Sequence, residues 1–225
     1  MKLVIYGMGA MARVLHSYLR LDGREVVAFT VDDHCIADGR AEFGGLPLVP
    51  FSRVAERFDP STHEMLVTVG YRDMNAMRAQ KCDEARNMGF RLASYVHSSV
   101  LVHDDVVFGD NCMVLDQVSI HPGTRVGDGV FISSNVNIGH DGMLGDMCWI
   151  NSGVAIAGGV SVGERTFIGV NATLSDGIEI GNDNFIGANT LVSRSTDNGE
   201  VMLSPPGEKF RLDSHSFLRF CARSE

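Results

Sequence analysis

Residues 126–162 read VGDGVFISSNVNIGHDGMLGDMCWINSGVAIAGGVSV, and a large apolar residue returns at every sixth position from Val126 onward. The same register holds in both directions, from Val96 to Val192, and glycine often follows the apolar residue. Six-residue repeats are typical of parallel β-helices, in which each short unit stacks on the next and buries a continuous core. The sequence therefore predicts a β-helix over residues 96–192 with seventeen inward positions: Val96, Val102, Phe108, Val114, Ile120, Val126, Ile132, Ile138, Leu144, Ile150, Ile156, Val162, Ile168, Leu174, Ile180, Ile186 and Val192.

Residues 1–95 show another pattern, in which short apolar runs alternate with stretches of helical spacing. This alternation is typical of βαβ units. We expect an α/β N-terminal domain with a reduced Rossmann-like βαβ fold over residues 1–95. Its expected strands are residues 3–6, 26–31 and 65–69, and its expected helices are residues 10–21, 52–58 and 73–88.

The repeat is lost after Val192, so residues 193–225 form a separate C-terminal segment. Pro205 and Pro206 stop regular structure there, and Phe217, Leu218 and Phe220 supply apolar side chains. A solenoid exposes apolar side chains at its open end. We therefore expect this segment to cap the last coil.

Composition narrows the class of protein. The net charge is -9 and Lys and Arg are not clustered, which argues against a nucleic-acid partner. Five cysteines without a C-x-x-C pair indicate free thiols in a reducing compartment. No apolar run reaches the length of a membrane span, and the N-terminus lacks a signal-peptide pattern. These features predict a cytoplasmic protein.

The string Asn137-Ile138-Gly139-His140-Asp141 lies inside the repeat and carries a candidate catalytic pair. His140 comes two places after the inward residue, so its side chain should point outward. Acyl transfer from a thioester to an amine or hydroxyl needs a general base, a role in which histidine is common, and Asp141 could orient its ring. The alternative is that both residues are solubilising side chains of a surface turn.

Residues 132–172, preceded by the α/β half, resemble the sialic acid O-acetyltransferases and bacterial UDP-4-amino-sugar N-acetyltransferases, a family of hexapeptide-repeat acyltransferases. The resemblance rests on the pair His140-Asp141 and on the turn at residues 157–160, AGGV. It implies a left-handed β-helix with three repeats per coil, a homotrimer with active sites between subunits, and His140 as general base.

The same resemblance implies acetyl-CoA as acyl donor, with contacts from Trp149, Gly158, Val170 and Ala188. Glycine at 158 would let a thioester approach the backbone closely, where an N–H could stabilise the oxyanion. Ala188 departs from the glycine that the family favours, which leaves a contact through its backbone. Trp149 could equally be a surface ring at a subunit contact.

Residues 6–12, YGMGAMA, match the G-x-G-x-x-A form of a dinucleotide fingerprint, with Asp32 and Asp33 about 20 residues further on. A β-helix that begins at residue 96 leaves no second half-domain for a nicotinamide, so NAD is not expected. The resemblance implies a site for the nucleotide of a nucleotide-sugar, formed by Gly9, Ala10, Met11, Asp32, Asp33, Gly70 and Arg72. The alternative is a structural glycine-rich turn.

His103 and His121 are 18 residues apart and should stack in adjacent coils. With His140 nearby they raise the alternative of a zinc hydratase. Their spacing does not match that class, so we expect no metal and place His121 in the substrate cleft.

Taken together, the sequence predicts an acetyl-CoA-dependent N-acetyltransferase that acts on a nucleotide-linked amino-deoxysugar, such as those used for lipopolysaccharide O-antigen. Two alternatives stay open. One is a sialic-acid-type sugar O-acetyltransferase, and the other is a non-catalytic protein that binds nucleotide-sugars.

Overall fold

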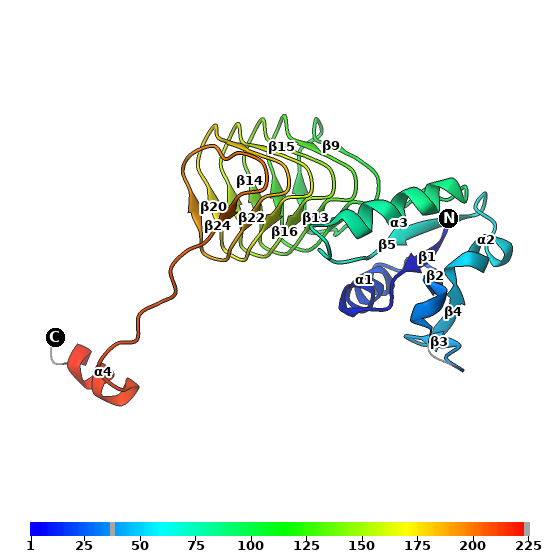
Figure 1. The fold of residues 1–225 in the computed structure, drawn as a ribbon, viewed down its shortest axis with the longest axis horizontal. Coiled ribbons are helices and arrows are strands. Elements are labelled where there is room, and N and C mark those ends of the chain that lie inside the picture. The colour runs from blue at the N-terminus through cyan, green and yellow to red at the C-terminus, as the bar shows by residue number, and fades with distance from the viewer. Residues whose placement is uncertain (37–38, 223–225) are drawn as a thin grey trace.

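The N-terminal half is a six-stranded sheet with helices on both faces in a computed structural model that describes residues 1–36 and 39–222 (Figure 1). The strand order is β3-β4-β2-β1-β5-β6, and neighbours are parallel except β3 and β4. Helix α1 packs on one face, and α2 and α3 pack on the other. The elements are β1 (Lys2–Tyr6), α1 (Ala10–Leu21), β2 (Val26–Val31), β3 (Glu42–Phe43), β4 (Leu46–Pro50), α2 (Val54–Arg57), β5 (His63–Val67), α3 (Ala76–Asn87) and β6 (Arg91–Leu92), with 3-10 turns at Asp33–Cys35 and Phe51–Arg53.

Sequence periodicity placed α1 correctly and placed α3 too early. Helix α3 begins at Ala76 because Asp73, Met74 and Asn75 all adopt left-handed φ values, between 43° and 67°, that no right-handed helix contains. Strands β3, β4 and β6 were not predicted. Two of them are only two residues long, which is too short to show an alternating pattern.

The second half is a β-helix built of two-residue strands that form three parallel sheets, here called the first, second and third faces (Figure 1). The first face contains β7 (Tyr95–Val96), β10 (Met113–Val114), β13 (Phe131–Ile132), β16 (Trp149–Ile150), β19 (Phe167–Ile168), β22 (Phe185–Ile186) and β24 (Val201–Met202). The second contains β8 (Leu101–Val102), β11 (Ser119–Ile120), β14 (Asn137–Ile138), β17 (Ala155–Ile156), β20 (Thr173–Leu174) and β23 (Leu191–Val192). The third contains β9 (Val107–Phe108), β12 (Arg125–Val126), β15 (Met143–Leu144), β18 (Ser161–Val162) and β21 (Glu179–Ile180).

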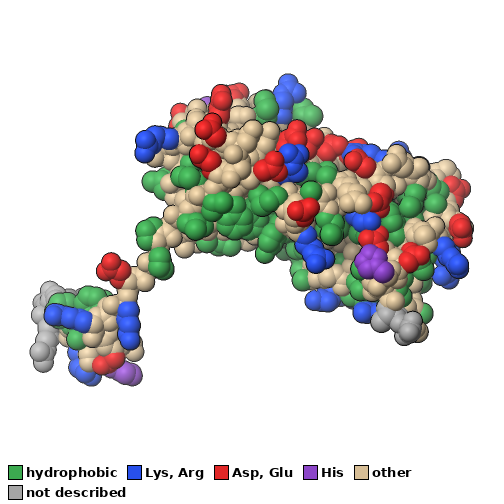
Figure 2. Space-filling view, in the orientation of Figure 1, with side chains coloured by type: hydrophobic (Ala, Val, Ile, Leu, Met, Phe, Trp, Pro, Cys, Tyr) green, Lys and Arg blue, Asp and Glu red, His purple; other side chains and the backbone are tan. Residues whose placement is uncertain are grey.

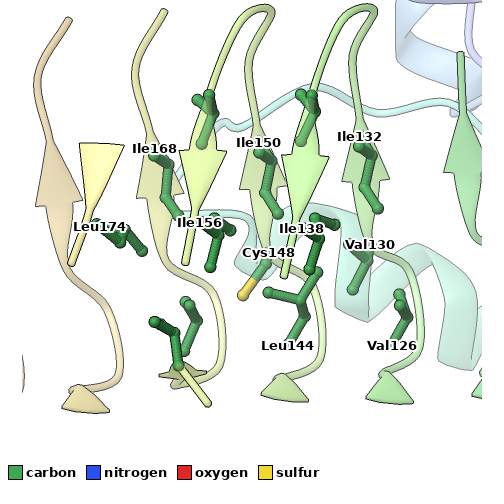
Figure 3. Close-up of a cluster of buried hydrophobic side chains, with 14 of the residues drawn as sticks. Val126, Val130, Ile132, Ile138, Leu144, Cys148, Ile150, Ile156, Ile168 and Leu174 are labelled. Atoms are coloured by element: carbon green, nitrogen blue, oxygen red, sulfur yellow. The ribbon is translucent and has the colours of Figure 1, made fainter. Parts of the chain in front are cut away.

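Each inward residue stacks on the residue 18 positions away, so three repeats make one coil. Ile132 pairs with Ile150, and Ile150 pairs with Ile168. The inward side chains from the three faces fill the interior as one apolar column (Figure 3). Val96 and Val102 are exceptions, 38% and 39% exposed, because no coil precedes the first one. The predicted inward positions are therefore buried except at this end, where Phe108 is also only partly buried.

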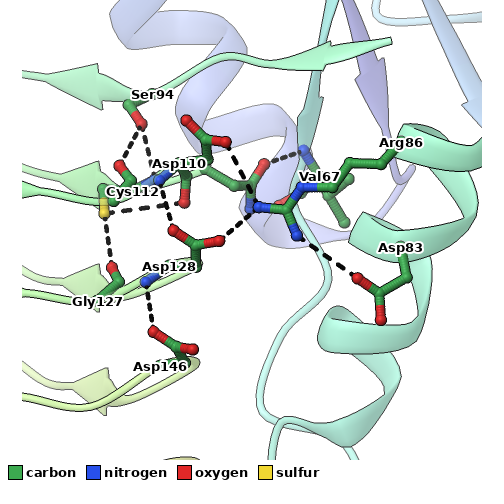
Figure 4. A network of polar contacts seen from close by, with 11 residues as sticks. Val67, Asp83, Arg86, Ser94, Asp110, Cys112, Gly127, Asp128 and Asp146 are labelled. Atoms are coloured by element: carbon green, nitrogen blue, oxygen red, sulfur yellow. Dashed lines mark hydrogen bonds and ion pairs between the residues drawn. The ribbon is translucent and has the colours of Figure 1, made fainter. Parts of the chain in front are cut away.

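Side chains at the corner between the third and first faces satisfy backbone groups of the coil below (Figure 4). The Asp128 carboxylate accepts the Asp110 N–H at 2.8 Å, and the Asp146 carboxylate accepts the Asp128 N–H at 2.8 Å. Arg86 of α3 pairs with Asp110 and Asp128. The acidic ladder thus supplies acceptors for otherwise unpaired amides and a contact for the N-terminal domain.

Only the first part of the C-terminal segment, residues 193–202, covers the last coil, and the aromatic residues that were expected to cap it do not. Residues 203–213 extend away from the last coil, and the short helix α4 (Ser214–Cys221) leaves Phe217, Leu218 and Phe220 exposed (Figure 1). The last complete coil is covered instead by a partial coil that ends in β24, whose Met202 packs against the core. In the described part of the chain, no helix is long and apolar enough to cross a bilayer.

Truncation after Gly207 should change the free energy of unfolding by less than about 0.5 kcal/mol, because the removed residues cover none of the core. Ile186→Ala, in the last complete coil, should cost about 2–5 kcal/mol because it leaves a cavity. Urea unfolding of the two variants measures both values. A large loss on truncation would show that the tail covers the β-helix after all.

Candidate active site

His140 and Asp141 lie at the corner between the second and third faces, in the turn that joins β14 to β15. The His140 Nδ1 is 2.9 Å from the Asp141 Oδ2, and both side chains are exposed. Asp141 has a left-handed φ of 54°, and its N–H donates to the Pro122 carbonyl at 2.8 Å. With Nδ1–H directed to the carboxylate, Nε2 is the nitrogen that can accept a proton.

Gly158 lies directly above His140 in the next coil, and its lack of a side chain makes space for the imidazole. A Cβ at position 158 would lie 2.5 Å from the His140 Nε2. The adjacent Gly139 is equally constrained, since a Cβ there would lie 2.5 Å from the Gly158 nitrogen. The Nε2 side of His140 therefore lies against bare backbone, which only glycine at position 158 allows.

His103 and His121 stack as expected, with ring centroids 6.1 Å apart. His121 begins the corresponding turn one coil below His140 and is partly exposed. Across residues 1–36 and 39–222 there is no group of three or more His, Cys, Asp or Glu side chains that could hold a metal ion. The zinc hydratase alternative therefore gains no support from the geometry.

The remaining residues expected to contact acetyl-CoA do not gather around His140 in one chain. Val170 and Ala188 are exposed and lie in consecutive coils at the corner between the first and second faces. Trp149 is 4% exposed, stacks on Phe131 and donates its indole N–H to Asn151. The ring fills the interface between the two domains, so its expected contact with acetyl-CoA stays a prediction for the Trp149 backbone.

Four of the residues expected to bind a nucleotide converge on one hollow of about 310 Å³, at the ends of β1, β2 and β5 where parallel-sheet proteins bind ligands. These are Gly9, Asp32, Gly70 and Arg72. The turn into α1 needs glycine at position 7, whose φ is 128° and where a Cβ would lie 2.5 Å from the Thr68 Oγ1.

Ala10, Met11 and Asp33, which were also expected there, do not line this hollow. Met11 packs against the core between the domains, and Ala10 is exposed at the start of α1. The Asp33 carboxylate accepts the Ser52 hydroxyl proton at 2.6 Å, so it faces the 3-10 turn that follows β4. Of the two neighbouring aspartates, only Asp32 lines the pocket.

Lys81, which sequence reasoning missed, pairs with the pocket residue Asp32 but does not itself line the hollow. From α3 its ammonium group lies 2.7 Å from both Asp32 and Glu84, and it lies over the rings of Tyr6 and Phe51. Burial alone would lower the pKa of Lys81, but the hydrogen bonds to the two carboxylates outweigh burial and raise it. No sequence signal links position 81 to position 32, since only the packing of α3 on the sheet brings them together.

The nucleotide hollow and His140 lie on different sides of the chain. The N-terminal domain packs against the first face through Tyr95, Met113, Phe131 and Trp149. His140 is at the corner opposite that face, between the other two. Within one chain the two parts of the site are therefore separated by the width of the β-helix.

Gly158→Ala should reduce activity and displace the imidazole, because the new methyl group collides with Nε2. The His140 side chain is 67% exposed and can turn aside, so the expected destabilisation is about 0.5–1.5 kcal/mol, the cost of an unfavourable rotamer. A double-mutant cycle with His140→Ala isolates this contact, because removal of the ring should relieve the cost. Equal destabilisation by Gly158→Ala in both backgrounds would contradict the contact.

Comparisons with known proteins agree with this architecture. A family model described as bacterial transferase hexapeptide (six repeats) matches residues 105–140 and 160–194. PerB from Caulobacter crescentus, solved in complex with CoA and GDP-perosamine, is 31% identical, with a TM-score of 0.80 over 89% of this chain and 93% of that chain.

Two more distant structures share the fold. The acetyltransferase domain of PglB from Neisseria gonorrhoeae, in complex with acetyl coenzyme A, is 22% identical, with a TM-score of 0.79 over 89% of this chain and 94% of that chain. WeeI from Acinetobacter baumannii is 13% identical, with a TM-score of 0.75 over 89% and 96%. A search of curated protein sequences gives no significant match. The chain belongs to the hexapeptide-repeat sugar acyltransferases and is an acyltransferase with a left-handed β-helix.

Proposed function

We propose that the protein transfers the acetyl group of acetyl-CoA to the amino group of a nucleotide-linked amino-deoxysugar. The observation that carries this proposal is the His140–Asp141 pair, held at 2.9 Å with Nε2 against the bare backbone of Gly158. The separate hollow at the glycine-rich turn of the N-terminal domain supports a nucleotide-linked acceptor. The similarity to PerB, solved with CoA and GDP-perosamine, points to the same pair of substrates.

In the proposed reaction the amine nitrogen attacks the thioester carbonyl and forms the new C–N bond. The C–S bond breaks, and the CoA sulfur leaves as a thiolate. His140 Nε2 removes the proton from the nitrogen and can return it to the thiolate, so protons balance. Asp141 holds the ring and stabilises its protonated form during this exchange.

The N-terminal hollow has groups suited to a nucleoside diphosphate. The first amides of α1 have no side-chain cap, and with Arg72 they can bind phosphate oxygens. Lys81 holds the Asp32 carboxylate through Oδ1, which leaves Oδ2 able to accept from a ribose hydroxyl.

We propose that the site forms between subunits of a homotrimer. The hollow and His140 lie on opposite sides of one chain, so a neighbouring subunit would bring its His140 to the sugar. Gly158 on one corner and Val170 and Ala188 on another could then contact the same acetyl-CoA from two subunits. Most soluble oligomers are homo-oligomers with closed symmetry, which a trimer satisfies.

Thiol release from acetyl-CoA, measured against a panel of UDP-, dTDP- and GDP-linked 4-amino-sugars, tests the function. At least one should react, and His140→Ala should lower kcat by about 10²–10⁴-fold, the usual contribution of a general base. Asp141→Asn should have a smaller effect because it keeps the ring in place. If thiol is released with a free sugar alcohol but with none of the amino-sugars, the protein is an O-acetyltransferase instead.

Subunit complementation tests the shared site. Gly9→Phe should block the hollow, and its Cβ would meet no atom within 4 Å. Co-expressed Gly9→Phe and His140→Ala chains should regain up to about a quarter of wild-type activity, the fraction of sites that pair two intact halves in random assembly. Mixed His140→Ala and His140→Asn chains serve as the control and should stay inactive. No recovery in the first mixture would place the site within one chain.

A further inference from the structure

Arg78 of α3 is a buried cation that lies between the nucleotide hollow and the β-helix. Its side chain is 0% exposed. All its hydrogen bonds go to neutral acceptors, and none of the ion pairs found within residues 1–36 and 39–222 includes it. Burial lowers the pKa of Arg78 to about 10, so it is charged at neutral pH. A buried charge that loses its hydrogen-bond acceptors is strongly destabilising.

On one side, Arg78 binds carbonyls of successive β-helix coils. Its Nε donates to the Gly129 carbonyl at 2.9 Å, and one terminal nitrogen donates to the Met147 carbonyl at 2.8 Å. The guanidinium also lies 5.2 Å from the centre of the Trp149 ring. Gly129 and Met147 occupy equivalent corner positions, so the β-helix offers Arg78 a rigid set of acceptors.

On the other side, Arg78 binds the loop that lines the hollow. Its second terminal nitrogen lies 3.3 Å from the Val69 carbonyl, 3.4 Å from the Gly70 carbonyl and 3.0 Å from the Asn75 Oδ1. Val69, Gly70 and Arg72 all line the hollow. One side chain therefore ties the pocket loop to the β-helix.

Both ends of the same loop are also fixed to the β-helix by amide side chains. Before the loop, the Asn111 side chain accepts the Val67 N–H at 2.8 Å and donates to the Val67 carbonyl at 3.0 Å. At its end, Asn75 donates to the Arg165 carbonyl at 3.0 Å, one coil beyond Met147. The left-handed residues 73–75 are costly conformations that persist only where surrounding contacts hold them.

We propose that Arg78 is a positioning residue for the nucleotide-sugar: it holds residues 69–75 against the β-helix in the shape that forms the nucleotide pocket. The identity of the ligand in this inference rests on the proposed function, whereas the role of Arg78 in holding the loop does not. The β-helix is then both the carrier of His140 and the template on which the nucleotide pocket is shaped.

The test compares Arg78→Gln and Arg78→Lys with Tyr18→Phe, which removes a different hydrogen bond between the domains, from Tyr18 to Asp116. Amide hydrogen exchange is measured at residues 67, 68 and 76, whose N–H groups are hydrogen-bonded at the two ends of the loop, and is called loop exchange below. Steady-state kinetics are measured on each folded protein. Arg78→Gln should speed exchange in the loop by about tenfold or more and raise KM for the nucleotide-sugar by about tenfold. KM for acetyl-CoA should stay within about twofold.

Arg78→Lys keeps the charge but cannot bridge both sets of carbonyls, so its effects should be intermediate. If Arg78→Gln does not fold, loop exchange and both KM values are compared between Arg78→Lys and the wild type. Tyr18→Phe should leave loop exchange and both KM values unchanged. If no nucleotide-sugar reacts even with the wild type, the proposed function fails while loop exchange still tests Arg78. Unchanged loop exchange in the Arg78 variants, or an equal rise in both KM values, would overturn the proposal.

Discussion

The structure depends on the stacking of coils 18 residues apart. An inward Ile or Val is buried only because the next coil places another apolar side chain on it, as Ile150 lies between Ile132 and Ile168. The first coil, which has no neighbour on one side, leaves Val96 and Val102 partly exposed. The repeat is thus a cooperative unit whose stability comes from contacts between neighbours.

Stacking also determines where the outward side chains of the β-helix lie, because outward positions form columns as regular as the inward ones. One column, with Tyr95, Met113, Phe131 and Trp149, is apolar and binds the N-terminal domain. Figure 2 shows further hydrophobic side chains gathered on the surface of the β-helix. Another column holds Gly158 above His140. The N-terminal domain therefore packs on the first face, and the candidate base His140 lies at the corner opposite that face.

The contact between the domains is more than a hydrophobic interface. Backbone carbonyls at the corners of the β-helix are fixed acceptors, and Arg78 and Asn75 use them in three successive coils. Such polar contacts are directional, so they define the position of the pocket loop in a way that apolar packing alone would not. The cost of burying a guanidinium is offset by its many acceptors.

The sequence by itself determined the β-helix, its register, the outward direction of His140 and the presence of α1 after a glycine-rich turn, because these follow from short-range periodicity and local backbone preferences. Only the tertiary structure decided that Trp149 is buried between the domains, that Lys81 contacts Asp32 and that Asp33 faces Ser52. It also decided that the aromatic residues of the tail lie away from the last coil. Those outcomes depend on which surfaces of distant segments pack together. No local pattern in the chain encodes that choice.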